Sequence, residues 1–205
     1  PRQGTHVVQL WHGSGAFKKW GYSTLDKSFG ASRKSATRFP MHNCYSLVPV
    51  SASTIIPHWA EAFNCDPSII KPLGVPRTDE FFNGDLESND FEGKKVILYA
   101  PTFRGNNVNL AHNDDALDIE DLHSALGNDY VLLLKMHPFV KNSIAIPESC
   151  KDFCFDVSNI STNKVLKMAD ILITDYSSII FEYSLLSRPM VFYPYDLESF
   201  VGERD

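Results

Sequence analysis

The chain has 205 residues, of which 43% are hydrophobic and 21% charged, as in an ordinary soluble globular protein. Its formal net charge of −6 argues against a nucleic-acid-binding protein, because such proteins usually carry a basic balance. No run approaches the roughly 20 apolar residues of a membrane span. The four cysteines are scattered and form no C-x-x-C pair, so we expect a cytosolic protein without a disulfide framework or a zinc site.

Strand and helix patterns alternate along the chain. In the first part we predict strands over residues 6–11 and 45–51, a helix over 53–63, and an extended, proline-rich crossing over 69–77. In the second part the patterns predict strands at 94–100, 130–135, 153–157, 171–173 and 190–194, and helices at 119–126, 163–169, 179–188 and 196–200. This alternation predicts an α/β fold of parallel sheets, in two units that divide into residues 1–77 and 78–205.

A basic stretch lies between residues 17 and 39 of this acidic protein. Asp26 is the one acidic residue in this stretch. The basic residues are Lys18, Lys19, Lys27, Arg33, Lys34 and Arg38. Such a patch is either a solvated surface or a dock for an anionic chain or a membrane surface.

The apolar run at 171–173 and the turn after it form the most informative stretch. The turn Thr174-Asp175-Tyr176-Ser177-Ser178 leads into a helix that we expect to stop before Pro189. Ser177 or Ser178 can cap that helix, and a helix start at the carboxyl end of a parallel strand is suited to binding phosphate. The alternative is an ordinary strand–turn–helix corner in which the serine only caps.

Polar residues recur where predicted strands end, which is where ligands gather in open α/β sheets. They are His12, then Thr102 and Arg104, then Lys135 and His137, then Asp175, Ser177 and Ser178. The His, Arg, Lys and Ser side chains among them are donors that match a phosphate or pyrophosphate, and Arg104 could bind two phosphate oxygens at once through its planar guanidinium. Glu182, one turn into the helix, either accepts from ribose hydroxyls or faces solvent. The chain has no Walker A pattern and no G-x-G-x-x-G fingerprint.

Several stretches, taken in order, resemble the CDP-glycerol glycerophosphotransferase family, the teichoic acid polymerases and primases. They are residues 10–13 (LWHG) with Lys18 and Lys19, 71–79 (KPLGVPRTD), 99–104 (YAPTFR), 134–138 (LKMHP), 174–178 (TDYSS) with Phe181 and Glu182, and 193–198 (YPYDLE). They follow the family's order and span nearly the whole chain.

The resemblance implies a GT-B fold, in which two Rossmann-like parallel-sheet units face each other across a cleft. Residues 1–77 would be the C-terminal part of an acceptor-side domain, and residues 78–205 would be the domain that binds CDP. Family members begin earlier and continue past the last motif, so we expect the first unit to be incomplete and the chain to be a piece at both ends.

The resemblance also implies a reaction. Glycerol phosphate, or ribitol phosphate, would move from a CDP-activated polyol to a hydroxyl of a lipid-linked teichoic-acid or capsule-type acceptor, with release of CMP and without a metal. His12 would be the general base, and His137 and Arg104 would stabilise the pyrophosphate and the leaving CMP. The residues expected to bind substrate are Gly13, Thr102, Lys135, Asp175, Tyr176, Ser177, Ser178 and Glu182.

The expected partners and location follow from the same resemblance. The basic region from Lys18 to Arg38 would meet the anionic acceptor or the membrane surface, and the protein would be cytoplasmic and peripheral at the inner face of the cell membrane. Two other functions stay open. One is a GT-B glycosyltransferase or epimerase that uses a nucleotide-sugar, and the other is a non-catalytic α/β module that only binds an anion.

Overall fold

The structure is a computed structural model that describes residues 1–27, 30–83, 91–105, 110–114, 116–140 and 144–204. The chain divides into two compact units, residues 1–82 with 198–205 and residues 83–197, and each is described here by itself. No helix in the described part of the chain is both long and apolar enough to cross a bilayer.

The second unit is built on a five-stranded parallel sheet with the order β5-β4-β3-β6-β7. The strands are β3 (Lys95–Tyr99), β4 (Tyr130–Leu134), β5 (Cys154–Asp156), β6 (Ile171–Thr174) and β7 (Met190–Phe192). Ile97 of β3 pairs with Leu132 of β4 on one side and with Ile171 of β6 on the other. The central strands are apolar along almost their whole length because the sheet is covered on both faces. The predicted strands of this unit are therefore confirmed.

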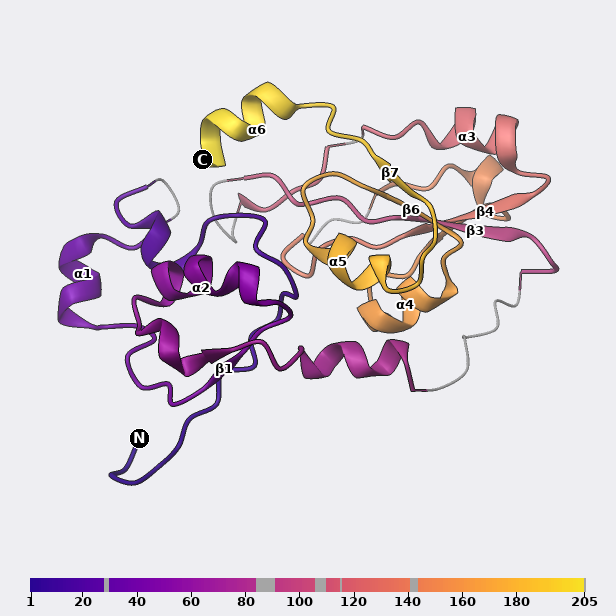
Figure 1. The fold of residues 1–205 in the computed structure, drawn as a ribbon. Coiled ribbons are helices and arrows are strands. Elements are labelled where there is room, and N and C mark those ends of the chain that lie inside the picture. Colours follow the sequence, from indigo (N-terminus) through magenta and orange to yellow (C-terminus); the bar gives the residue numbers. More distant parts are fainter. Residues whose placement is uncertain (28–29, 84–90, 106–109, 115, 141–143, 205) are drawn as a thin grey trace. The chain divides into compact units, whose positions relative to one another are not determined.

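Helices cover the two faces of this sheet. Figure 1 shows α4 (Thr162–Met168) and α5 (Ile179–Ser184) together on one side and α3 (Ile119–Leu126) on the other. On the α3 side, Ile119 packs into a core with alternate residues of the central strands, among them Ile97 and Leu132. The Asp118 side chain starts α3 by accepting from the backbone N–H of Asp121, as an N-cap residue does.

The strand order places a topological switch point between β3 and β6. From β3 the chain adds β4 and β5 on one side, and it then returns to add β6 and β7 on the other side. In open α/β sheets the crevice outside the carboxyl ends of two such strands is the usual place for a ligand. The ends of β3 and β6 carry the motifs that begin at residues 99 and 174.

The first unit has less regular structure. Its strands β1 (Val48–Pro49) and β2 (Ile70–Lys71) pair in parallel, and α2 (Ile56–Phe63) covers them with Trp59 and Phe63 in the core. The other elements are α1 (Arg33–Arg38), α6 (Leu197–Arg204), and the 3₁₀ turns η1 (Gly21–Thr24), η2 (Ser53–Ile55), η3 (Pro67–Ile69) and η4 (Pro76–Phe81). In the second unit η6 (Glu148–Cys150) precedes β5.

Three predicted elements differ from the structure. The strand predicted over residues 6–11 is wrong, because only Val8 forms a bridge, with Leu47, and Trp11 leaves the extended conformation with φ of 55°. The strand predicted over 45–51 shrinks to β1, although the backbone N–H of Val50 still donates to the carbonyl of Lys71 at 2.8 Å. The helix predicted over 179–188 ends at Ser184, and the next three residues continue in tighter i to i−3 turns.

Candidate active site

The ends of β3 and β6 are tied together at the switch point. The backbone N–H of Thr102 donates to Oδ1 of Asp175 at 2.8 Å, and Oγ1 of Thr174 donates to the carbonyl of Ala100 at 2.7 Å. Thr102 is buried, and its own Oγ1 has no hydrogen-bond partner among the described residues. A buried hydroxyl without a partner is uncommon in folded proteins, so this atom is a candidate contact for a ligand.

Arg104 joins three strand ends. Its Nε and Nη2 donate to the two carboxylate oxygens of Asp196, at 2.6 and 2.9 Å, and Nη2 also donates to Oδ2 of Asp175 at 2.9 Å. Its Nη1 donates to the carbonyl of Thr102. Arg104 is 8% exposed, and two carboxylates therefore surround one buried cation. This arrangement holds the ends of β3, β6 and β7 in one geometry.

Two tyrosines complete this cluster. The Tyr176 and Tyr195 rings lie 5.4 and 5.2 Å from the guanidinium of Arg104, and the Tyr176 hydroxyl donates to Asp196 at 3.1 Å. Burial, followed by the hydrogen bond to Asp196, raises the pKa of Tyr176 to about 12. Burial opposes ionisation of Asp196, but the hydrogen bonds and charge of Arg104 outweigh it and lower the pKa of that carboxyl. At neutral pH the Tyr176 phenol is therefore neutral and the Asp196 carboxylate ionised.

Asp196 and Tyr195 were missed as site residues by sequence reasoning. The stretch 193–198 was noted as a motif, but no role was assigned to its polar members. Their position in the sequence could have identified them. They follow the strand β7 directly, as Thr102 follows β3 and Asp175 follows β6. Their partner Arg104 lies 92 residues away from Asp196, and local patterns do not reveal such a pairing.

The residues after β6 lead into α5. Ser178 stands at the N-cap position without a side-chain capping bond, and Oγ of Ser177 accepts from the N–H of Ile179 at a long 3.5 Å. Both serines are half-buried. Glu182 is 2% exposed, which rules out the alternative of a solvent-facing glutamate. The turn thus places two hydroxyls and a buried carboxyl beside the switch point.

The end of β4 carries Lys135 and His137. The ammonium of Lys135 donates to the carbonyls of Ser158 and Ile160, at 2.7 and 2.6 Å, so this side chain fixes the turn after β5. The His137 ring lies 4.7 Å from the rings of both Phe103 and Phe139.

The backbone around His137 orients its ring. Its Nδ1 accepts from the backbone N–H of Phe139 at 3.2 Å. In a neutral imidazole the other nitrogen, Nε2, then carries the proton and can donate to a ligand.

His12 and Gly13 belong to the first unit. His12 is exposed, its ring lies 4.5 Å from that of Trp11, and its carbonyl accepts from Nη1 of Arg77. Trp11 has a φ of 55°, a left-handed conformation that is strained for a bulky side chain and is typical of functional sites.

The predicted site residues thus form three groups. Thr102, Arg104, Asp175 and Tyr176 form one bonded cluster at the switch point, and Ser177, Ser178 and Glu182 follow directly on the chain. Lys135 and His137 stand at the end of β4, and His12 and Gly13 lie in the first unit. Among the described residues, no three His, Cys, Asp or Glu side chains group in a way that could hold a metal ion.

The doubly wound sheet and its strand-end site define a GT-B-like α/β protein. Over residues 1–205 the chain matches the family described as CDP-Glycerol:Poly(glycerophosphate) glycerophosphotransferase, and it belongs to that family. The resemblance drawn from the sequence motifs is therefore confirmed.

Curated relatives carry names from teichoic acid synthesis. The chain is 43% identical to the teichoic acid ribitol-phosphate primase of Bacillus spizizenii strain W23, a match that covers 100% of this chain and 55% of the relative. It is 34% identical to the teichoic acid glycerol-phosphate primase of Bacillus subtilis strain 168, covering 99% of this chain and 54% of the relative. The chain spans about half the length of these curated relatives.

Solved structures of one polymerase share the fold. The wall teichoic acid polymerase TagF is 27% identical, with a TM-score of 0.80 over 97% of this chain and 52% of that chain. A TagF variant soaked with CDPG is also 27% identical, with a TM-score of 0.82 over 98% of this chain and 52% of that chain.

Proposed function

We propose that the protein containing this chain transfers a polyol phosphate from a CDP-linked donor to a hydroxyl of a lipid-linked acceptor, with release of CMP. The observation that carries the proposal is the meeting of two family motifs, residues 99–104 and 174–178, at the switch point between β3 and β6. The buried, unpartnered Oγ1 of Thr102 at this point suits a phosphate oxygen. The CDPG soaked into a TagF variant supports the same class of donor.

The second unit provides the donor site in this proposal. Nε2 of His137 and the hydroxyls of Ser177 and Ser178 donate to the pyrophosphate, and Glu182 accepts from the ribose. These donors stabilise the charge that develops on the leaving CMP. The reaction is an in-line phosphoryl transfer, so catalysis comes mainly from positioning and electrostatic stabilisation.

We propose for Arg104 a role other than the one that the resemblance implies. Direct contact with the pyrophosphate was predicted for it, but its guanidinium donates to Asp175, Asp196 and the Thr102 carbonyl. We therefore assign Arg104 and Asp196 as positioning residues that fix the switch-point crevice. Lys135, which donates to two carbonyls, supports the β4 end in the same way.

The first unit provides the general base. Nε2 or Nδ1 of neutral His12 takes the proton of the acceptor hydroxyl as that oxygen attacks the phosphorus of the polyol phosphate. The new phosphate ester bond forms as the bond to CMP breaks, and CMP leaves with the electron pair. The space beside Gly13 is open, since a Cβ added there would meet only one side-chain atom, at 3.9 Å.

Ribitol phosphate is the favoured polyol. Four ribitol-phosphate enzymes among the relatives are 40–43% identical to this chain. Four glycerol-phosphate enzymes are 30–34% identical. We therefore propose CDP-ribitol as the donor and CDP-glycerol as the poorer substrate.

The acceptor and the location complete the proposal. The basic region from Lys18 to Arg38 provides charge for an anionic lipid-linked polymer or for the inner face of the cell membrane; residues 28–29 of this region lie outside the described part of the chain. Its helix α1 carries Arg33, Lys34 and Arg38 as exposed side chains.

A donor panel tests the proposed function. The whole protein is incubated with a lipid-linked acceptor and with CDP-ribitol, CDP-glycerol or UDP-N-acetylglucosamine, and the released nucleotide is quantified. Release of CMP with extension of the acceptor, faster from CDP-ribitol than from CDP-glycerol, is expected. Turnover of the UDP-sugar alone would overturn the proposal in favour of a glycosyltransferase or epimerase, and binding without any turnover would favour an anion-binding module.

A further inference from the structure

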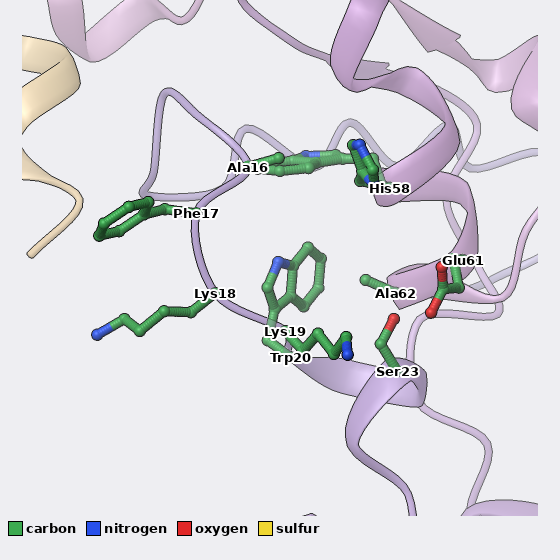
Figure 2. A pocket seen from close by; sticks show the side chains of 10 residues that line it. Ala16, Phe17, Lys18, Lys19, Trp20, Ser23, His58, Glu61 and Ala62 are labelled. Carbon is green, nitrogen blue, oxygen red and sulfur yellow. The ribbon is translucent and has the colours of Figure 1, made fainter. Parts of the chain in front are cut away.

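The first unit contains a pocket of its own. Its cavity of about 230 Å³ is lined by the stretch 16–20, by Ser23 of η1 and by one face of α2. Figure 2 shows Lys19, Ser23 and Glu61 directing their polar ends toward the same side of the pocket, with Trp20 at its centre. His58 adds an imidazole from α2. The lining therefore combines cationic, anionic and aromatic side chains.

A close backbone contact builds this pocket. Gly21 has a φ of +59°, and a Cβ added there would lie 2.3 Å from the carbonyl oxygen of Ala62. Only glycine tolerates both conditions, so the chain at Gly21 can lie directly against α2. Next to it, the Trp20 ring packs edge-on against Trp59 at 5.4 Å and against Phe63 at 4.6 Å. The wall of the pocket is thus held by aromatic packing on the core of the unit.

A buried donor without a partner belongs to a residue that lines this pocket. Trp59 is 2% exposed and lines the cavity, and its Nε1 has no hydrogen-bond partner among the described residues. An indole nitrogen can only donate, so an acceptor on a bound molecule would satisfy this N–H. Lys19 adds a positive charge at the same pocket, which suits a phosphate group.

The remaining polar groups suit hydroxyls. The carboxylate of Glu61 accepts hydrogen bonds, the hydroxyl of Ser23 donates or accepts, and the imidazole of His58 does either. A ligand that carries both a phosphate and several hydroxyls can form hydrogen bonds with all of these groups. A bare anion would instead be repelled by the carboxylate of Glu61. The volume of about 230 Å³ lies below the roughly 300–1,000 Å³ of pockets for drug-sized ligands, so the occupant is a single small unit.

The pocket is connected to His12 within the same unit. Trp20 stacks on Trp11 at 4.2 Å, and the Trp11 ring lies 4.5 Å from that of His12. A molecule in the pocket therefore lies two aromatic rings away from the proposed general base.

We propose that this pocket binds one polyol-phosphate unit of the acceptor chain, next to the unit whose hydroxyl reacts. This inference rests on the proposed function and deepens it, because it assigns an acceptor subsite outside the strand-end motifs. A phosphoglycerol lipid headgroup shares the same chemistry, and the test below separates the two sources.

The test measures acceptor kinetics in the whole protein with a soluble, short oligo(polyol phosphate) acceptor. Lys19→Gln and Trp59→Phe each remove one phosphate donor, and Lys95→Gln is the control because Lys95 is exposed at the amino end of β3. We expect both pocket variants to raise the KM for the acceptor about tenfold, with the affinity for the CDP-linked donor unchanged in calorimetry. Lys95→Gln should leave both quantities unchanged. An acceptor KM within twofold of the unsubstituted protein for Lys19→Gln overturns the inference.

Further measurements separate failure of the proposed subsite from misfolding of a variant and from failure of the proposed function. If Trp59→Phe impairs folding, Lys19→Gln decides alone, since Lys19 is exposed. If the unsubstituted protein transfers no polyol phosphate from any CDP-linked donor, the proposed function fails, whereas normal transfer with an unchanged KM overturns the subsite only. Sedimentation with phosphatidylglycerol vesicles, against phosphatidylcholine vesicles, tests the headgroup. Loss of vesicle binding in Lys19→Gln together with an unchanged acceptor KM would assign the pocket to the membrane and overturn the proposal.

Discussion

Arg104 and Asp196 form a two-point ion pair across 92 residues of sequence, with Nε to Oδ2 at 2.6 Å and Nη2 to Oδ1 at 2.9 Å. The pair joins the loop after β3 to the segment after β7, and Asp175 after β6 takes a third hydrogen bond from the same guanidinium. The planar fork of arginine can make these contacts at once, whereas a lysine ammonium cannot reproduce the geometry.

The first prediction concerns this cluster and stability. Replacement of Arg104 by Leu should lower the unfolding free energy by about 3 kcal/mol, because it leaves the buried carboxylate of Asp175 without its cation. Arg104→Lys keeps the charge without the fork and should recover part of the loss. Urea denaturation measures both variants. A loss below about 1 kcal/mol for Arg104→Leu would show that the ion pairs are not important for the fold.

The second prediction concerns the loss of folding stability at low pH. The pKa of Asp196 in the folded protein lies below its ordinary value of 3.8, because Arg104 outweighs the effect of burial. A lowered carboxyl pKa stabilises the fold above the unfolded pKa, and this contribution is lost as pH falls through the folded pKa. The unfolding free energy should therefore decline between about pH 5 and pH 2, and less steeply in Asp196→Asn. Identical slopes for the two proteins would contradict the assignment.

The third prediction concerns Gly21. Gly21→Ala places a Cβ 2.3 Å from the carbonyl oxygen of Ala62 and forces alanine to a φ of +59°. We expect a loss of more than about 2 kcal/mol of stability, since the left-handed backbone alone costs about 1–2 kcal/mol. The matched control is Gly4→Ala, which has a φ of +83° and no atom within 4 Å of the added Cβ. Equal thermal shifts for the two variants would mean that the close contact with α2 costs nothing.

The fourth prediction concerns His137 as a donor to the pyrophosphate. Because Nδ1 accepts from the N–H of Phe139, Nε2 carries the proton of the neutral ring. His137→Phe should weaken binding of CDP-ribitol about tenfold, or ~1.4 kcal/mol, whereas His137→Gln keeps an N–H near the Nε2 position and should lose less. Calorimetry measures both affinities. His123→Gln, which removes a ring stacked on Phe153, is the control, and a change within twofold for His137→Phe would exclude the contact.

The second unit could be predicted well from sequence. Its strands are short apolar runs covered on both faces, so burial and strand propensity favour the same structure, and β3, β4 and β6 appear where the runs predicted them. The helix predicted over residues 119–126 has those bounds, since Asp118 caps its start. The rule that ligands gather at strand ends also predicted that Thr102 and Asp175 lie close together. The structure confirms this, since the backbone N–H of Thr102 donates to Oδ1 of Asp175 at 2.8 Å.

The first unit could be predicted less well. The run at residues 6–11 is mostly apolar and predicts a strand, yet the left-handed conformation of Trp11 and the aromatic packing on Trp20 determine its structure instead. Those are tertiary contacts, which local patterns do not contain. In the same way, sequence placed Arg104 at a phosphate because its position fitted, and only the folded chain reveals that Asp175 and Asp196 already surround it.

The most direct test of the proposed function is a paired measurement on His12→Ala in the whole protein, with the exposed His6→Ala as control. Calorimetry gives the affinity for CDP-ribitol, and CMP release in the presence of acceptor gives turnover. We predict a fall in turnover of at least about 100-fold with donor affinity unchanged, because a general base contributes about 10²–10⁴ in rate and His12 lies outside the unit that we propose to bind the nucleotide. Near-normal turnover in His12→Ala would contradict the proposed mechanism.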